Sequence, residues 1–275
     1  AVWQEIPWEH KQIEPHYLMG ETVAYSLGAA IEKIVFMAIG SSTNSRTIYS
    51  SKLRYSASGN SLNTVVLHNK SFLYDLCCIF NSVIFDSVVR AKLTGLNINQ
   101  FILFECPVID QSKRFLLKTV AGKLCDYDRI FAASVSNDSF ALPFAITETE
   151  RLRLKIISDA IVAKLFNLAN NDMTHVLADC DHPIVSISNK KFAAKLNPKG
   201  FWRVDKEKEP ELRQTVLTLV AFHDLEKKIA ECGGDTEAGI KAFCEQNNGE
   251  GWILPETLRL ADYGLGHDER AKEYQ

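Results

Sequence analysis

Two short clusters of polar residues contain the side chains that metal or acid–base chemistry requires. Asp179, Cys180, Asp181 and His182 follow one another, with His175 a short distance upstream. Carboxylate, thiolate and imidazole groups all bind metals, but structural zinc sites usually have paired Cys or His spacings, and this segment has a single Cys. We interpret the segment as a polar turn and assign no metal ligand, with a metal site as the alternative.

The second cluster is Asp224 with Glu226, Lys227 and Lys228, a set of carboxylate and lysine side chains of the kind that nucleases use. The apolar residues around it recur with helical spacing, and in a helix such a charge run is a solvated face. We therefore predict no catalytic residue here.

The motifs of several enzyme classes are missing from the chain. It has no phosphate-binding G-x-x-x-x-G-K-[S/T] loop, no G-x-G-x-x-G after a strand, no G-x-S-x-G and no H-E-x-x-H. It also lacks the Asn/Asp/Ser-Pro-Pro-aromatic tetrapeptide of amino-methyltransferases. The nearest string, Asn-Pro-Lys-Gly at residues 197–200, has neither the second Pro nor the aromatic residue. No catalytic residue is predicted, and whether the chain is part of an enzyme is left open.

Cationic and amide side chains concentrate in residues 40–65 and 90–100, which contain no Asp or Glu. Arg and Lys bind phosphates or guanine, amides match the edge of adenine, and hydroxyls bind phosphates. We predict DNA contacts from nine residues of these spans: Asn44, Arg46, Thr47, Lys52, Arg54, Arg90, Lys92, Asn97 and Asn99. The alternatives are that the Asn side chains hold turns and that Asp86 and Arg90 form an internal ion pair.

Composition limits these interpretations. Of 275 residues, 46% are hydrophobic and 24% are charged, which is ordinary for a globular chain with a core. The net charge of −3 excludes a generally basic protein and opposes strong autonomous DNA binding. Seven Cys without a C-x-x-C pair predict buried thiols in a reducing compartment, and hence a cytoplasmic location. No apolar run approaches the length of a membrane span.

Periodicity predicts an α+β fold with a mixed sheet and a buried helix first and helices afterwards. Strands are expected at residues 34–39, 47–50, 64–68, 96–104 and 184–187. Helices are expected at residues 71–94, from the Thr147-x-x-Glu150 capping box, after Asn171, from Pro210 to Gly233, after Asp235 and after Pro255. We divide the chain into an irregular lead-in (1–30), an α+β unit (31–145) and a helical supporting unit (146–275).

One ordered series of motifs goes beyond generic pattern. Residues 42–47, Ser-Thr-Asn-Ser-Arg-Thr, precede Asn81-Ser82, Asp86, Arg90 and Lys92. Gly95, Leu96-Asn97 and Pro107-Val108 follow, and later come an Arg151–Leu177 helical stretch and a Gly251-Trp252 tail. The series resembles the C-terminal target-recognition region of adenine-specific DNA methyltransferases, fused restriction–modification enzymes and related phage-defence proteins. It departs from that family at Leu96 and Asn97, where relatives often carry a His before the Leu-Asn or Ile-Asn step.

The resemblance implies a DNA-sequence recognition module that positions double-stranded DNA for a catalytic domain outside this chain. It implies that the partner is an N-terminal methyltransferase domain of the same polypeptide and that S-adenosylmethionine is the cofactor of the parent, with none in this fragment. Both ends, Ala1 and Gln275, are then expected to be cuts in a longer chain. The alternative is a protein-interaction or scaffold domain of a phage-defence complex, which the negative net charge favours.

Overall fold

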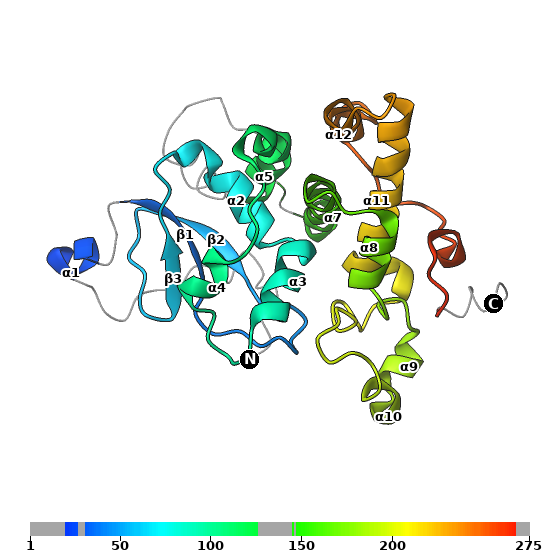
Figure 1. The fold of residues 1–275 in the computed structure, drawn as a ribbon, viewed down its shortest axis with the longest axis horizontal. Coiled ribbons are helices and arrows are strands. Elements are labelled where there is room, and N and C mark those ends of the chain that lie inside the picture. The colour runs from blue at the N-terminus through cyan, green and yellow to red at the C-terminus, as the bar shows by residue number, and fades with distance from the viewer. Residues whose placement is uncertain (1–19, 27–30, 126–144, 146, 268–275) are drawn as a thin grey trace.

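A computed structural model describes residues 20–26, 31–125, 145 and 147–267 (Figure 1). Most of the lead-in expected at residues 1–30 lies outside these ranges, and only the short helix α1, Glu21–Ser26, falls within them. The α+β class is confirmed, because a small sheet near the N-terminus is followed by helices. In Figure 1 the sheet and α2 to α5 form one side of the molecule, α7 lies in the middle, and α8, α11 and α12 form the other side.

The sheet has three strands in the order β2-β1-β3. Strand β1 (Glu32–Met37) pairs antiparallel with both β2 (Ser50–Arg54) and β3 (Leu62–Val65), so the sheet is simpler than the mixed sheet expected from the sequence. The apolar run predicted as a buried strand is the central one, and its Ile34 and Phe36 are at most 1% exposed. The second strand begins at residue 50 rather than 47, and the third ends at residue 65 rather than 68.

The long helix predicted for residues 71–94 is three elements: a 3-10 turn (Lys70–Phe72), α2 (Leu73–Phe80) and α3 (Val83–Lys92). The two helical pieces meet at 72°. The break follows from local chemistry, since the Ser82 hydroxyl accepts the backbone N–H of Phe85 and so begins a new helix. The predicted burial is confirmed, because Leu73, Ile79, Val83 and other residues of both helices are core residues.

Two predicted strands are helices. Residues 100–104 form α4 (Gln100–Phe104), and of the preceding stretch only Asn97 makes a β-bridge, with Ile39. Residues 184–188 form α9 (Ile184–Ser188). Alternating or β-branched residues favour a strand locally, but a strand also needs a partner edge, and neither segment pairs with β1, β2 or β3.

The helical part follows the predicted order more closely. Its elements are a 3-10 stretch (Gln111–Leu117), α5 (Lys118–Cys125), α7 (Glu148–Leu165), α8 (Asn170–Val176), α10 (Lys190–Ala193), a 3-10 turn (Pro210–Leu212), α11 (Gln214–Glu231), α12 (Thr236–Glu245) and a 3-10 turn (Leu260–Tyr263). The predicted cap of α7 is confirmed, with Glu150 N 3.2 Å from Thr147 Oγ1. The helix expected after Pro255 is reduced to the last 3-10 turn.

One apolar core runs through both predicted units. Helix α7 lies at its centre, packs on α11 and α5, and buries Ile156, Ala160 and Ile161 completely. Within the described residues, no single helix is long and apolar enough to cross a membrane; the bent pair Lys70–Phe80 and Val83–Lys92 meets the length and composition criteria only together. The division at residue 145 stays a prediction.

Helix α12 packs on α11 at a glycine, Gly239. A Cβ atom on Gly239 would lie 2.6 Å from the Ile229 Cα and closer still to its side chain. Real Cβ atoms do not approach another carbon this closely, so only a residue without a side chain lets the two helices pack here.

Candidate nucleic-acid interface

The residues that carry the resemblance meet at one buried carboxylate. Asp86, on α3, is fully buried and accepts hydrogen bonds from Arg46 Nε at 3.0 Å and Arg90 Nε at 2.6 Å. It also accepts the backbone N–H of Thr47 at 2.8 Å and of Ile48 at 3.4 Å. A carboxylate with this many donors holds the loop before β2 against α3.

Asn81 supplies a second lock at the α2–α3 break. Its Oδ1 accepts the backbone N–H of Ser50 at 2.9 Å, and its Nδ2 donates to the backbone carbonyl of the same residue at 2.9 Å. The Arg46 guanidinium also donates to the Asn81 backbone carbonyl. A side-chain amide thus takes the place of a neighbouring strand at the first residue of β2, which gives Asn81 a structural role.

Arg90 extends the network into the helical part. Its side chain is 2% exposed, and its Nη2 donates to the Ser45 carbonyl at 2.6 Å. Its Nη1 donates to the carbonyls of Lys199 and Gly200 at 3.2 and 3.3 Å, and its guanidinium lies 4.1 Å from the centre of the Phe201 ring. The internal Asp86–Arg90 pair expected as an alternative is confirmed.

The other predicted contact residues lie apart. Asn44, Asn97 and Asn99 are exposed. Arg54 Nε lies 2.9 Å from Glu32 Oε1, and Lys92 Nζ lies 3.3 Å from Glu105 Oε2. The five predicted cations therefore do not converge on one surface: Arg90 is in the core, Arg54 and Lys92 pair with acids, and only Arg46 and Lys52 share a pocket.

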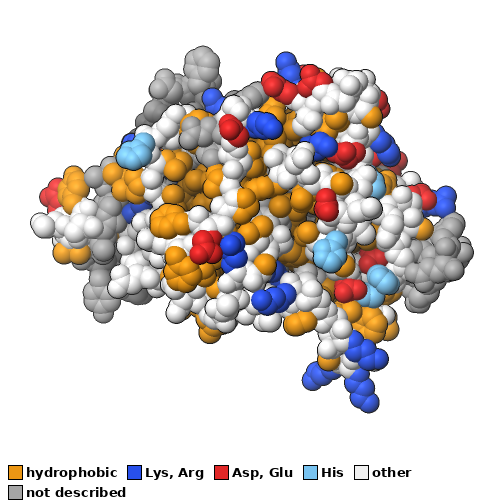
Figure 2. All heavy atoms as spheres, in the orientation of Figure 1, with side chains coloured by type: hydrophobic (Ala, Val, Ile, Leu, Met, Phe, Trp, Pro, Cys, Tyr) orange, Lys and Arg blue, Asp and Glu red, His pale blue; other side chains and the backbone are white. Residues whose placement is uncertain are grey.

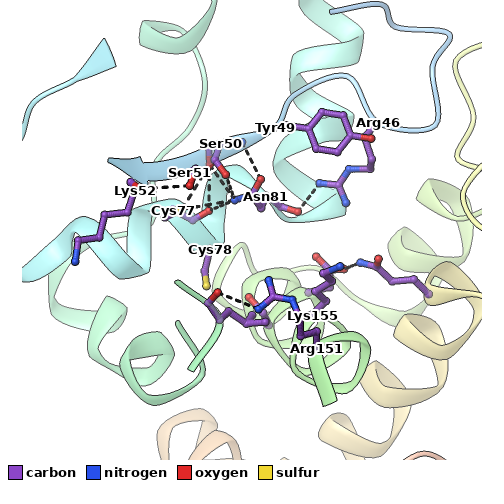
Figure 3. A pocket seen from close by; sticks show the side chains of 14 residues that line it. Arg46, Tyr49, Ser50, Ser51, Lys52, Cys77, Cys78, Asn81, Arg151 and Lys155 are labelled. Atoms are coloured by element: carbon purple, nitrogen blue, oxygen red, sulfur yellow. Dashed lines mark hydrogen bonds between the residues drawn. The ribbon is translucent and has the colours of Figure 1, made fainter. Parts of the chain in front are cut away.

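That pocket lies between the start of β2 and helix α7 and has a volume of about 280 Å³ (Figure 3). One wall, formed by β2 and the loop before it, contains Arg46, Tyr49 and Lys52. The opposite wall is α7, which contains Arg151 and Lys155. The remaining described lining residues are Ser50, Ser51, Cys77, Cys78, Asn81, Leu124, Ser158, Asp159 and Gln214. Four cations and one carboxylate thus line the pocket among the described residues, with hydroxyl and amide groups beside them. Arg46 is already paired with Asp86, and the Lys52 ammonium lies against Tyr74.

The carboxylate of the pocket, Asp159, is buried and accepts two hydrogen bonds. Burial raises the pKa of Asp159. The positive charge of Arg46 and the hydrogen bonds that Asp159 accepts from Val83 N and Gln214 Nε2 oppose this increase. Lys52 is oriented by its neighbour Tyr74, whose hydroxyl lies 2.6 Å from Lys52 Nζ. The pocket is therefore suited to an anion, because its cations outnumber a single acid whose ionisation burial disfavours.

Sequence reasoning missed part of this basic character. Arg151 and Lys155 were seen only as members of a helix. Residues 183–205 were interpreted as loop-like apart from a short strand at 184–187, although the part from 183 to 204 holds five cations and no acid: Lys190, Lys191, Lys195, Lys199 and Arg203. The four lysines are exposed, and Figure 2 shows cationic side chains projecting from the end of the molecule where Figure 1 places α10. The same count of acids that singled out residues 40–65 would have found this segment.

The two clusters considered first have different outcomes. Asp224 lies on α11, as predicted, where it accepts Trp252 Nε1 at 2.9 Å and pairs with Lys227, while Glu226 pairs with Lys164. These contacts join helices and the Gly251-Trp252 segment. In the other cluster, at residues 179–182, Asp179 and His182 lie close to His267, which is the last residue that the structure describes.

Comparison with known proteins gives no relative: no family model, no curated protein and no solved structure matches this chain.

Proposed function

We propose that this chain is a DNA-recognition module of an adenine-specific DNA methyltransferase or restriction–modification enzyme, and that it holds the phosphate backbone in the basic pocket between β2 and α7. The observation that carries the proposal is the pocket itself, with four cations and one carboxylate in a chain whose net charge is −3. Phosphate contacts of this kind give affinity and position, while base contacts give sequence preference.

The buried network supports the same proposal indirectly. Asp86 and Asn81 fix the backbone of residues 46–50, and this segment supplies Arg46, Tyr49 and Ser50 to the pocket. A rigid loop loses little conformational freedom on binding, which is how recognition surfaces are usually built. In this proposal Arg90 and Thr47 act inside the protein and position the loop. Arg46 lines the pocket while paired with Asp86, and Lys52 faces the DNA.

Other parts of the proposal rest on the resemblance. S-adenosylmethionine and the methyltransferase domain belong to the parent polypeptide, and this chain contributes specificity. We place the protein in the cytoplasm, where buried thiols such as those of Cys78, Cys106 and Cys180 stay reduced.

The direct test is a fluorescence anisotropy titration of the 275-residue chain with labelled duplex DNA at several salt concentrations. Lys52→Ala and Lys155→Ala remove pocket cations, and Lys241→Ala removes an exposed cation on α12 as the control. Each pocket variant is expected to weaken binding and to reduce the slope of log K against log salt by about 0.9. The control should bind as the wild type does.

Two results would contradict the proposal: no detectable binding by the wild type at low salt, or equal salt slopes in pocket variants and control. Tyr74→Phe separates positioning from charge, because it removes the hydroxyl beside Lys52 Nζ and leaves the cation in place. A smaller loss with Tyr74→Phe than with Lys52→Ala is expected.

A second candidate, a protein-interaction module, is favoured by an apolar surface around α4. Five large apolar side chains there are between 52% and 83% exposed: Ile39, Leu96, Phe101, Phe104 and Val108. Figure 2 shows apolar atoms gathered at the surface in this region. Single exposed apolar residues are ordinary, but a contiguous group marks an interface. This candidate predicts no salt-dependent DNA binding by the wild type, and self-association in light scattering that Phe101→Ser with Phe104→Ser abolishes.

A further inference from the structure

We propose that Asp179, His182 and His267 bind a divalent metal ion of the zinc class and that this ion ties the end of the described chain to the helical part. One ligand atom from each residue lies within 4.8 Å of the other two. The site is separate from the basic pocket, and the proposal does not depend on DNA binding.

Part of the site already has metal-like geometry. His182 Nε2 lies 3.2 Å from Asp179 Oδ1, and the two imidazole rings are 4.0 Å apart between centroids. Ligands of a tetrahedral zinc ion lie about 3.3–3.5 Å apart, given bond lengths of about 2.0–2.2 Å. The first pair fits this spacing, and His267 is exposed, so its ring can move the remaining distance without disturbing the core.

The backbone around the site is fixed by a residue that is not a ligand. Asp181 is 1% exposed, and its Oδ2 accepts the backbone N–H groups of Gly266 and His267 at 2.8 and 2.9 Å. This carboxylate holds a segment 85 residues away in sequence and presents the His267 ring to His182. Outer groups that orient metal-binding imidazoles in this way are a general feature of metal sites.

The chemistry of the three side chains selects the ion. Two imidazoles and one carboxylate suit zinc and neighbouring transition metals, whereas magnesium and calcium prefer oxygen ligands alone. Three protein ligands leave a fourth position for water or another ligand.

Two neighbours considered from the sequence are not ligands in this arrangement. Cys180 is 1% exposed, and burial raises the pKa of its thiol to about 12, so it does not offer a thiolate. His175 is exposed on α8 and is not part of the group. His175 therefore provides a matched control for histidine substitutions.

The test is a calorimetric titration of the 275-residue chain with ZnCl₂, with MgCl₂ as the comparison ion. The variants are His267→Ala, which removes an exposed ligand at little risk to folding, Asp179→Asn, and His175→Ala as the control. We expect the wild type and His175→Ala to bind one zinc ion per chain. We expect His267→Ala and Asp179→Asn to bind at least about tenfold more weakly.

A second readout is the thermal midpoint, which zinc should raise in the wild type and in His175→Ala but not in His267→Ala. Cobalt should give the intense visible bands of a tetrahedral site in the wild type and lose them in His267→Ala. The proposal is overturned if the wild type binds no zinc at one ion per chain. It is equally overturned if His267→Ala binds as tightly as the wild type, or if His175→Ala is weakened to the same extent.

Discussion

Replacing Asp86 by Asn tests whether the buried network holds the loop at residues 46–50 that precedes and begins β2. The substitution keeps the size of the side chain but removes its charge and turns one acceptor oxygen into an N–H donor. That amide must face donors on every side, because the carboxylate accepts from Arg90 Nε at 2.6 Å, Arg46 Nε at 3.0 Å and Thr47 N at 2.8 Å. Two guanidinium groups, with side chains 2% and 11% exposed, then lack their counter-charge.

Removing one partner of a buried ion pair costs about 3–5 kcal/mol. The retained oxygen of Asn still accepts some of the hydrogen bonds, so we expect a loss near the lower end, about 3 kcal/mol, in the free energy of unfolding. A domain with about 5–15 kcal/mol of stability stays folded after such a loss. The magnitude can therefore be measured rather than inferred from loss of expression.

The assay is urea unfolding followed by tryptophan fluorescence and far-ultraviolet circular dichroism. Glu105→Gln is the control, because it breaks the exposed pair with Lys92, whose side chains are 34% and 64% exposed, and should cost less than about 1 kcal/mol. Arg90→Met, made alone and together with Asp86→Asn, closes a double-mutant cycle, and we expect the pair to couple by at least about 1 kcal/mol. A loss with Asp86→Asn no larger than that of the control would refute the network as the element that holds the loop.

Three further predictions follow from single residues. Burial raises the pKa of Asp159 above its ordinary 3.8, so the folded state holds the proton more tightly than the unfolded state; the stability that this proton contributes is present below a pH of about 4 and is lost as the pH rises through the pKa of the folded state. The urea midpoint of Asp159→Asn should therefore rise relative to that of the wild type between pH of about 4 and about 7. A difference between the two midpoints that does not change with pH would contradict this. Gly239→Ala should cost about 1–3 kcal/mol because its Cβ meets Ile229, whereas Gly59→Ala, which has open space around it, should be neutral in the same thermal melts. After iodoacetamide treatment of the native protein, mass spectrometry should find the partly exposed Cys232 alkylated and Cys180 unmodified, because burial raises the pKa of the Cys180 thiol to about 12. Alkylation of Cys180 before Cys232 would refute the burial of Cys180.

Elements with local signals were predictable from the sequence. Three such elements depend only on residues a few positions apart: the cap of α7 at Thr147, the cap of α12 at Asp235 and the apolar run of β1. Residues 96–104 and 184–187 were mispredicted because β-branched and alternating residues favour a strand only when a partner strand is present. The break at Ser82 was missed because the apolar pattern continues through it.

The candidate site was less predictable, for a physical reason. Asp86 meets its loop partners 38 to 40 residues away, and Arg90 meets carbonyls 109 and 110 residues away. A single sequence does not encode such pairings in any local spacing. Composition did single out two residues that line the pocket, Arg46 and Lys52. It could not separate an accessible cation from one that, like Arg90, is buried among carbonyls.

The contact of Arg90 with the Lys199 and Gly200 carbonyls has a consequence for protein engineering. A chimaera that joins residues 31–145 of this chain to an unrelated helical part would bring a buried guanidinium without two of the acceptors that satisfy it. Exchange of residues 31–145 should therefore give a stable protein only when residues 198–201 are transferred with them, as a graft of two separate segments. A single-crossover chimaera that lacks residues 198–201 and is as stable to urea as the parent chain would show that Arg90 does not need these two acceptors.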